Sequence, residues 1–170
     1  MPMVVSDLIS RLTAIYLREY SSDSGQVLFS ESSLVILPAN AAAAWADALA
    51  SYGSTATAMG STVVSIAANK EAVAAALLPV FSMQGSPTFA TDFFTAVSSL
   101  WLAPPVAFVN GGVVTDATIG ISPAAASLMS LPPVPDNVSA AVSMAGIVDA
   151  YFRTVLVTVP LVPPVVVPLL

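Results

Sequence analysis

The sequence contains no cysteine and no histidine, which removes several kinds of chemistry at once. Without cysteine there is no thiolate nucleophile and no disulfide, and without histidine there is no imidazole base or haem ligand. Zinc sites built from these two residue types are excluded as well. A serine nucleophile would need a lysine as its base, and the chain has one lysine, Lys70. Lys70 lies beside Glu71 in a pattern typical of a solvated pair on a helix surface.

Other catalytic patterns are equally sparse. Two carboxylates can act as acid and base, and the candidate pairs are Asp92 with Asp116 and Asp47 with Glu71. These residues are scattered, and helix capping or surface solubility explains them better. The glycines at 111–112 lack the following residues of a phosphate-binding loop. We therefore expect no enzyme, no cofactor, no metal site and no small-molecule substrate.

Charged residues are scarce. They make up 8 % of the chain, against about 25 % in typical soluble domains, while apolar residues make up 56 %. The net charge is −6, and the four basic residues, Arg11, Arg18, Lys70 and Arg153, form no cluster. This distribution argues against binding to nucleic acid or to an anionic membrane surface. So few charges cannot coat a single domain, and we expect part of the surface to face other subunits or lipid.

A membrane span is not favoured by the apolar segments. The longest uncharged run, 23 residues between Asp92 and Asp116, is long enough to cross a bilayer. It contains Pro104-Pro105 and the Gly-Gly pair, which break a helix, and the run after Arg153 contains four prolines. The first ten residues lack a basic segment, so we expect no signal peptide.

Apolar residues at helical spacing predict an all-α fold of five or six short helices. The expected helices cover residues 6–20, 41–52, 66–78, 86–101, 123–131 and 136–155. Ser86 and Asp136 are expected caps, and Pro79 is expected to end its helix. The segment 54–65 is expected to be a linker or a frayed helix.

Two other segments do not follow the helical pattern. Residues 26–38 place β-forming residues on both sides of 31–33, which favours a hairpin or an extended arm. Residues 103–122 form a long connection rich in Pro, Gly and β-branched residues, and such connections are usually functional or ordered by a partner. We expect a helical domain over 1–156, containing both segments, and an extended Pro-rich arm over 157–170.

The C-terminal stretch VTVPLVPPVVVPLL has no charge, and four of its fourteen residues are proline. Pro160 and Pro163 are one polyproline II turn apart, which favours an extended strip. Either this strip folds back over its own helices and completes the core, or it docks in a groove of a neighbouring protein. In the second case the interface residues are Tyr151 and Arg153 at its base, followed by Val159, Leu161, Val162, Val165, Val166, Val167, Leu169 and Leu170.

The order of several motifs resembles a group of small Ala- and Pro-rich structural proteins of tailed bacteriophages. The motifs are AAAAWADALASYG, EAVAAALLPVF, FATDFFTAVSSLW, LAPPVAFVNGGVV and IVDAYFRTVLVTVPLVPP, and they span roughly residues 40–160. The resemblance is one of pattern and composition. It implies a virion protein of the neck, tail or capsid surface, assembled in the host cytoplasm with copies of itself and neighbouring virion proteins. The N-terminal helix, the 26–38 insert and the longer apolar tail depart from the group.

The leading hypothesis is therefore a non-enzymatic structural subunit of a viral particle that assembles through apolar surfaces and the C-terminal arm. The alternative is a membrane-associated protein whose apolar segments contact lipid. A third hypothesis, a module that binds a small ligand in an apolar pocket, has no convergent polar group to support it.

Overall fold

The structure is a computed structural model that describes residues 3–30, 36–83 and 85–170. These residues form six α-helices, one short 3-10 helix and five strands. The helices are α1 (Val5–Tyr16), α2 (Pro38–Gly53), α3 (Lys70–Ser82), α4 (Phe89–Leu102), α5 (Ile121–Met129) and α6 (Asn137–Phe152), with the 3-10 helix at Ala67–Asn69. The strands are β1 (Thr57–Ala58), β2 (Ser61–Thr62), β3 (Val113–Asp116), β4 (Leu156–Val159) and β5 (Val165–Pro168).

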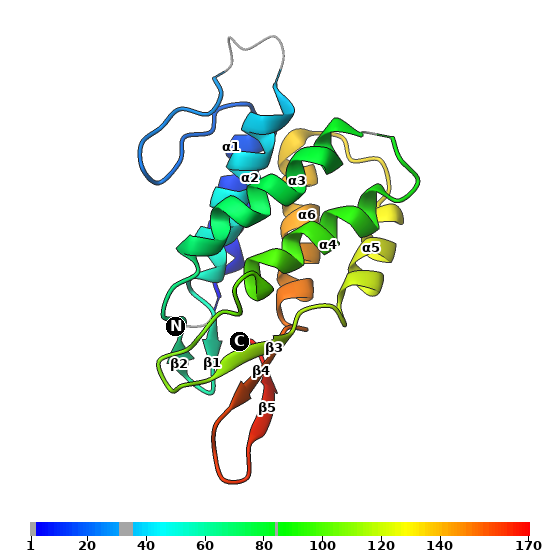
Figure 1. Ribbon diagram of the computed structural model, residues 1–170. Coiled ribbons are helices and arrows are strands. Elements are labelled where there is room, and N and C mark those ends of the chain that lie inside the picture. Colours follow the sequence, from blue (N-terminus) through cyan, green and yellow to red (C-terminus); the bar gives the residue numbers. More distant parts are fainter. Residues whose placement is uncertain (1–2, 31–35, 84) are drawn as a thin grey trace.

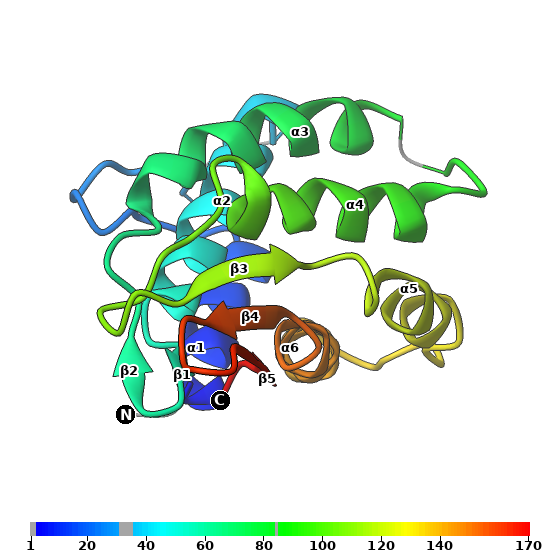
Figure 2. The same cartoon turned by 60° about the horizontal axis from the view of Figure 1, so that its bottom comes forward.

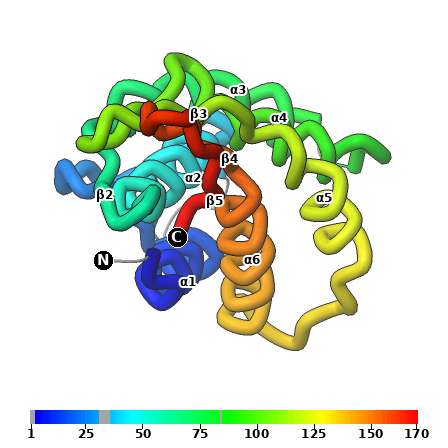
Figure 3. The backbone as a smooth tube through the Cα atoms, turned by 90° about the horizontal axis from the view of Figure 1, so that it is seen from below, coloured from blue at the N-terminus to red at the C-terminus, as the bar shows by residue number. Residues whose placement is uncertain are grey.

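The helices form a closed circuit. Each packs against the next along the chain, and α6 returns to pack against α1. Figure 1 shows the helices above the strands, and Figure 3 shows α5 at the side of the molecule beside α4 and α6. Burial follows the helical repeat, because Leu8, Leu12 and Ile15 of α1 all face inward.

A chain of aromatic rings runs through the core. Trp45 of α2 meets Phe93 of α4 with ring centroids 5.3 Å apart, and Phe94 lies 5.2 Å from Tyr151 of α6. Phe152 then meets Trp101 at 5.0 Å in an edge-to-face arrangement. Large rings at helical spacing therefore supply the packing that holds α2, α4 and α6 together.

The helix ends agree with the sequence only in part. The Asp136 carboxylate accepts a hydrogen bond from the Ser139 N–H at 2.8 Å, which confirms the expected cap of α6. Pro79 does not end α3, which continues to Ser82 with the proline inside. Ser86 does not begin α4 directly, since that helix starts at Phe89.

The expectation of an all-α fold is wrong, because strands pair at one end of the helices. Within 54–65, β1 and β2 form a tight antiparallel hairpin. Its two turn residues, Met59 and Gly60, have φ of +50° and +76°, the left-handed pair that a two-residue hairpin of this twist requires. The 103–122 connection contributes β3, and the C-terminal stretch contributes β4 and β5 in the order β3-β4-β5.

Backbone pairing joins these strands into a closed circuit. The pairs, in order, are Thr57–Thr62, Val63–Phe108, Ala107–Val113, Val114–Val157, Val157–Val167 and the reciprocal bonds between Leu170 and Thr57. Closure leaves little strand edge unpaired. Figure 2 shows β3 and β4 lying side by side, with β5 and the C-terminus close to β1.

The expected extended arm is a β-hairpin instead. β5 folds back antiparallel onto β4, and Leu169 is buried at 1 % exposure. The Leu169 N–H donates to the Val155 carbonyl, on the side of β4. Backbone groups alternate in direction along a strand, so those of Val166, Pro168 and Leu170 point to the opposite edge, away from β4. Proline has no N–H, so Pro168 is tolerated there without the loss of a bond to β4.

Within the 26–38 segment, the structure describes a short pairing between Ser21 and Val27 and a bond from the Leu28 N–H to the Tyr20 carbonyl. Residues 31–35 of that expected hairpin or arm lie outside the described residues.

Candidate functional site

The most concentrated polar chemistry lies around Asp47, on the buried face of α2. Its carboxylate accepts hydrogen bonds from Lys70 Nζ at 2.8 Å, from the Tyr20 hydroxyl at 2.8 Å and from the Asp23 N–H at 3.3 Å. Burial raises the pKa of Asp47, but the bonds from Lys70 and Tyr20 outweigh it and hold the pKa below its usual 3.8. Burial, together with the nearby Asp47 carboxylate, raises the pKa of the Tyr20 hydroxyl.

This cluster works as a clamp. Two hollows of about 310 and 580 Å³ flank it, and Asp47 and Lys70 line both. The Asp47 carboxylate is the acceptor for Lys70, for the Tyr20 hydroxyl and for the Asp23 N–H. Lys70 therefore forms its ion pair with Asp47 rather than with Glu71, its neighbour in the sequence. The cluster therefore ties the 20–28 segment and α3 to α2.

Of the two discounted candidate carboxylate pairs, Asp47 and Glu71 line the same hollow, while Asp92 and Asp116 each make separate local contacts. Asp92 accepts a hydrogen bond from the Thr88 hydroxyl at 2.7 Å, beside the start of α4. Asp116 accepts bonds from the Thr118 N–H at 2.7 Å and the Thr118 hydroxyl at 2.8 Å. Both are local contacts of the capping kind, as the scattered spacing suggested.

A second ionic group lies near the end of α6. Asp149 accepts a hydrogen bond from the buried Tyr52 hydroxyl and a bond from Arg153 Nε at 3.0 Å. Arg153, one of the expected interface residues, is thus held along its own helix four residues from its partner. Burial, followed by the Asp149 carboxylate, raises the pKa of Tyr52.

The expected interface residues other than Arg153 fall into three groups that differ in burial. Tyr151, Val159 and Leu169 are buried in the chain itself, and the Tyr151 hydroxyl donates to the Ala117 carbonyl at 2.7 Å. Val159 and Leu169 therefore cannot line an external surface, whereas Tyr151 lines a groove between α5 and α6. Val167 is half-buried, and the remaining apolar members, Leu161, Val162, Val165, Val166 and Leu170, are exposed.

Four of the exposed residues, Leu161, Val162, Val165 and Val166, form what we call the hairpin patch, at the far end of β4 and β5. Val162 is completely exposed, at 103 % of its reference area. Residues 154–170 contain no charged side chain. Figure 1 shows this hairpin projecting from the body, away from the helices.

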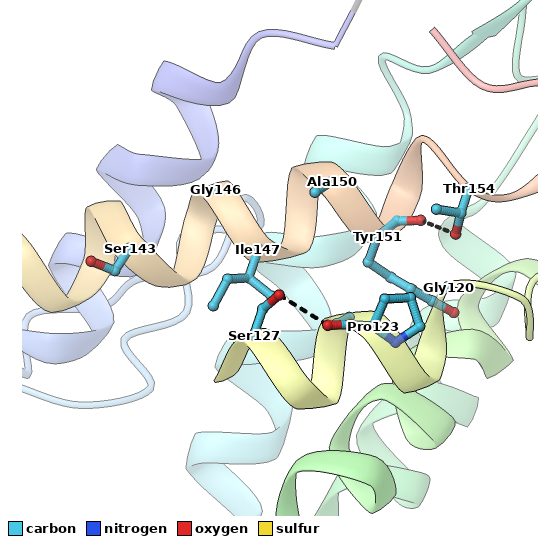
Figure 4. Close-up of a pocket in the computed structure, with 10 residues that line it drawn as sticks. Gly120, Pro123, Ser127, Ser143, Gly146, Ile147, Ala150, Tyr151 and Thr154 are labelled. Atoms are coloured by element: carbon cyan, nitrogen blue, oxygen red, sulfur yellow. Dashed lines mark hydrogen bonds between the residues drawn. The ribbon is translucent and has the colours of Figure 1, made fainter. Parts of the chain in front are cut away.

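A groove separates α5 from α6 on another side of the molecule. It has a volume of about 400 Å³ and is lined from α5 by Pro123, Ala124 and Ser127. The α6 wall consists of Ser143, Gly146, Ile147, Ala150, Tyr151 and Thr154. Figure 4 shows Ile147 and Ser127 on its opposite walls. Gly120 and Thr154 close one end, because a Cβ at Gly120 would overlap the Thr154 hydroxyl.

The total exposed area of the chain is ordinary, but the surface has unusually few charged side chains. The chain exposes 8210 Å², close to the roughly 7,800 Å² typical of a monomer of its mass. Twelve of the twenty exposed large apolar side chains in the described residues lie in 109–170. Charge-poor, apolar surface of this kind is typical of contacts with other proteins.

The chain matches no family model, and no curated protein or solved structure matches it at a significant level. Among the described residues, no helix has the length and apolar character needed to cross a membrane. The same residues contain no group of three His, Cys, Asp or Glu side chains placed to hold a metal ion.

Sequence reasoning missed the Asp47 cluster and the groove. Asp47 and Lys70 are 23 positions apart, with no local pattern to join them. The small residues of α6 were visible, but the groove depends on where α5 packs.

Proposed function

We propose that this protein is a non-enzymatic structural subunit of a viral particle and assembles with copies of itself and neighbouring virion proteins. The observation that carries the proposal is the hairpin patch, which is apolar, uncharged and fully exposed at Val162. The resemblance to structural proteins of tailed bacteriophages supports the virion setting, in the neck, tail or capsid surface.

The hairpin suits a docking role for physical reasons. Its base is fixed by β3, by the buried Leu169 and by the bonds between Leu170 and Thr57. A rigid projection loses little conformational entropy when it docks, so more of the apolar contact contributes to affinity. Its apolar tip would serve as the central anchor of an interface.

Sedimentation of the full chain without detergent tests the proposal. The wild-type protein should form larger species as its concentration rises. Val162→Asp should weaken this association by about 100-fold or more, because docking would bury an unpaired carboxylate. Val162 makes no contact that folding needs, so the circular dichroism spectrum and melting temperature should not change.

Val27→Asp is the matched control, since Val27 is also exposed, at 64 %, in the 20–28 segment. It adds the same charge and should leave association unchanged. A wild-type chain that stays monomeric at high concentration would refute assembly. Flotation of the wild-type chain with neutral lipid vesicles, lost in Val162→Asp, would instead support the membrane-associated alternative.

A further inference from the structure

We infer that the groove between α5 and α6 receives the hairpin patch of a second copy of this chain, so that copies join head to tail. The inference rests on the proposed function, because it names the partner of the hairpin patch. It commits the groove to one occupant, the tip of another copy.

The groove is shaped for an apolar, convex insert. Its volume of about 400 Å³ falls within the range of about 300–1,000 Å³ typical of binding pockets. The Ser127 hydroxyl donates to the Pro123 carbonyl at 2.9 Å and the Thr154 hydroxyl to the Tyr151 carbonyl at 2.7 Å, as Figure 4 shows. Both hydroxyl protons are therefore used within their own segments, and an apolar side chain entering the groove would not leave them unpaired.

Charge favours this pairing over other contacts between copies. The chain carries a net charge of −6, and most of its acidic residues lie in the first 71 positions. Two copies that met through that region would bring carboxylates together. The residues that line the groove include no charged side chain, Asp149 and Arg153 of the α6 end pair with each other, and residues 154–170 contain no charged residue. The groove and the hairpin patch are therefore two surfaces that can meet without repulsion.

The hairpin patch and the groove of the same copy cannot meet each other. The hairpin tip lies at the far end of β4, whose four residues span about 13 Å, and it points away from the helices (Figure 1). A contact between two different surfaces of one chain is heterologous, so successive copies build a ring or an open filament.

Gly146 provides a specific way to fill the groove. It lies on the groove wall, and a Cβ at this position would have no heavy atom within 4 Å. Gly146→Gln should therefore fold, with a gain in helix propensity, while its side chain occupies the groove. We expect it to weaken self-association about ten-fold or more. Ala126→Gln, on an exposed position of α5 that does not line the groove, is the matched control and should associate like the wild type.

Mixing two defective variants tests the head-to-tail geometry. Val162→Asp keeps an open groove and Gly146→Gln keeps an intact tip, so each alone should stay monomeric at the lowest concentration at which the wild type associates. Their mixture can form one compatible contact, and sedimentation should show a dimer that grows no further. A folded pair that forms no dimer when mixed would overturn the inference.

The absence of cysteine allows a direct test of proximity. Val162→Cys mixed with Ser143→Cys should form a mixed disulfide under mild oxidation, because bridged residues need Cα atoms about 4.4–6.8 Å apart. Mixed with Ala126→Cys, the same tip variant should not cross-link. If Gly146→Gln assembles like the wild type while Val162→Asp does not, the head-to-tail contact is wrong and the proposed function stands.

Discussion

Nine of the fourteen charged residues lie in the first 71 positions, whereas residues 117–170 contain three. The first region is organised by ionic contacts, with Asp47 receiving Lys70, Tyr20 and Asp23, and Arg11 bridging Asp7 and Asp23. In the second region, Asp149 and Arg153 pair with each other, and the tail is held by strand pairing and buried apolar side chains.

Under the proposed function, this difference would let one chain be stable and also associate with other copies. Charged groups in the N-terminal region keep its surface hydrated and discourage contacts between copies. The C-terminal region has an apolar interior and also an apolar exterior, at the hairpin patch and around the α5–α6 groove. The same residue types thus pack in the core on one side and, in the proposed assembly, would dock on the other.

The largest expected effect is in the tail. Leu169→Ala should lower the free energy of unfolding by about 3 kcal/mol, because it removes a fully buried side chain. In a domain of this size, that lowers the melting temperature by roughly 9 °C. Leu170→Ala, the neighbour whose side chain is 51 % exposed, should cost less than about 1 kcal/mol. Equal melting of both variants and the wild type would mean that the tail is not part of the core.

The next effect tests the ionic region. Asp47→Asn keeps the shape of the side chain but weakens the bonds from Lys70 and Tyr20, and it should cost about 2 kcal/mol in urea unfolding. Asp23→Asn makes the same chemical change at a carboxylate that is 58 % exposed, and should cost less than about 1 kcal/mol. Similar losses in both variants would contradict the view that Asp47 is a buried clamp.

Local signals explain what the sequence revealed about this fold. The helical repeat locates six helices because each helix buries one face, and Asp136 marks a helix start through a bond three residues away. β1 and β2 escaped notice because each has two residues and the turn places Met59, not an Asn or Gly, in a left-handed conformation. Nothing in the sequence fixes the register that puts Pro168 on an outer edge, so the tail's prolines suggested an isolated strip.

The candidate site was predictable to a similar degree. Apolar, uncharged composition singled out the C-terminal stretch, and five of its large apolar side chains are exposed. Which of them are exposed depends on the alternation of β4 and β5 around the core, a tertiary property. The burial of Val159 and Leu169 followed from strand pairing that composition does not reveal.

A smaller expected effect is the loss of stability at acidic pH. Because Asp47 has a folded-state pKa below its usual 3.8, its ionised form stabilises the protein. That contribution is fully present above the unfolded pKa and is lost as pH falls through the folded pKa. The gap in unfolding free energy between the wild type and Asp47→Asn should therefore narrow from about pH 5 down to about pH 3. A gap that stays constant over this range would show that the carboxylate is not the group responsible.

The smallest expected effect is a difference in how added salt acts on the two regions. The exposed bonds of Arg11 should weaken as ionic strength rises, at a cost of at most about 1 kcal/mol of stability. Association through the hairpin patch and the groove should not weaken, since neither surface carries a charge, and it should tighten slightly as the repulsion between copies with a net charge of −6 is screened. Sedimentation at low and high salt measures this directly. An association that falls ten-fold with added salt would mean that ionic residues of the N-terminal region make the contact, and the contrast between the two regions would then be reversed.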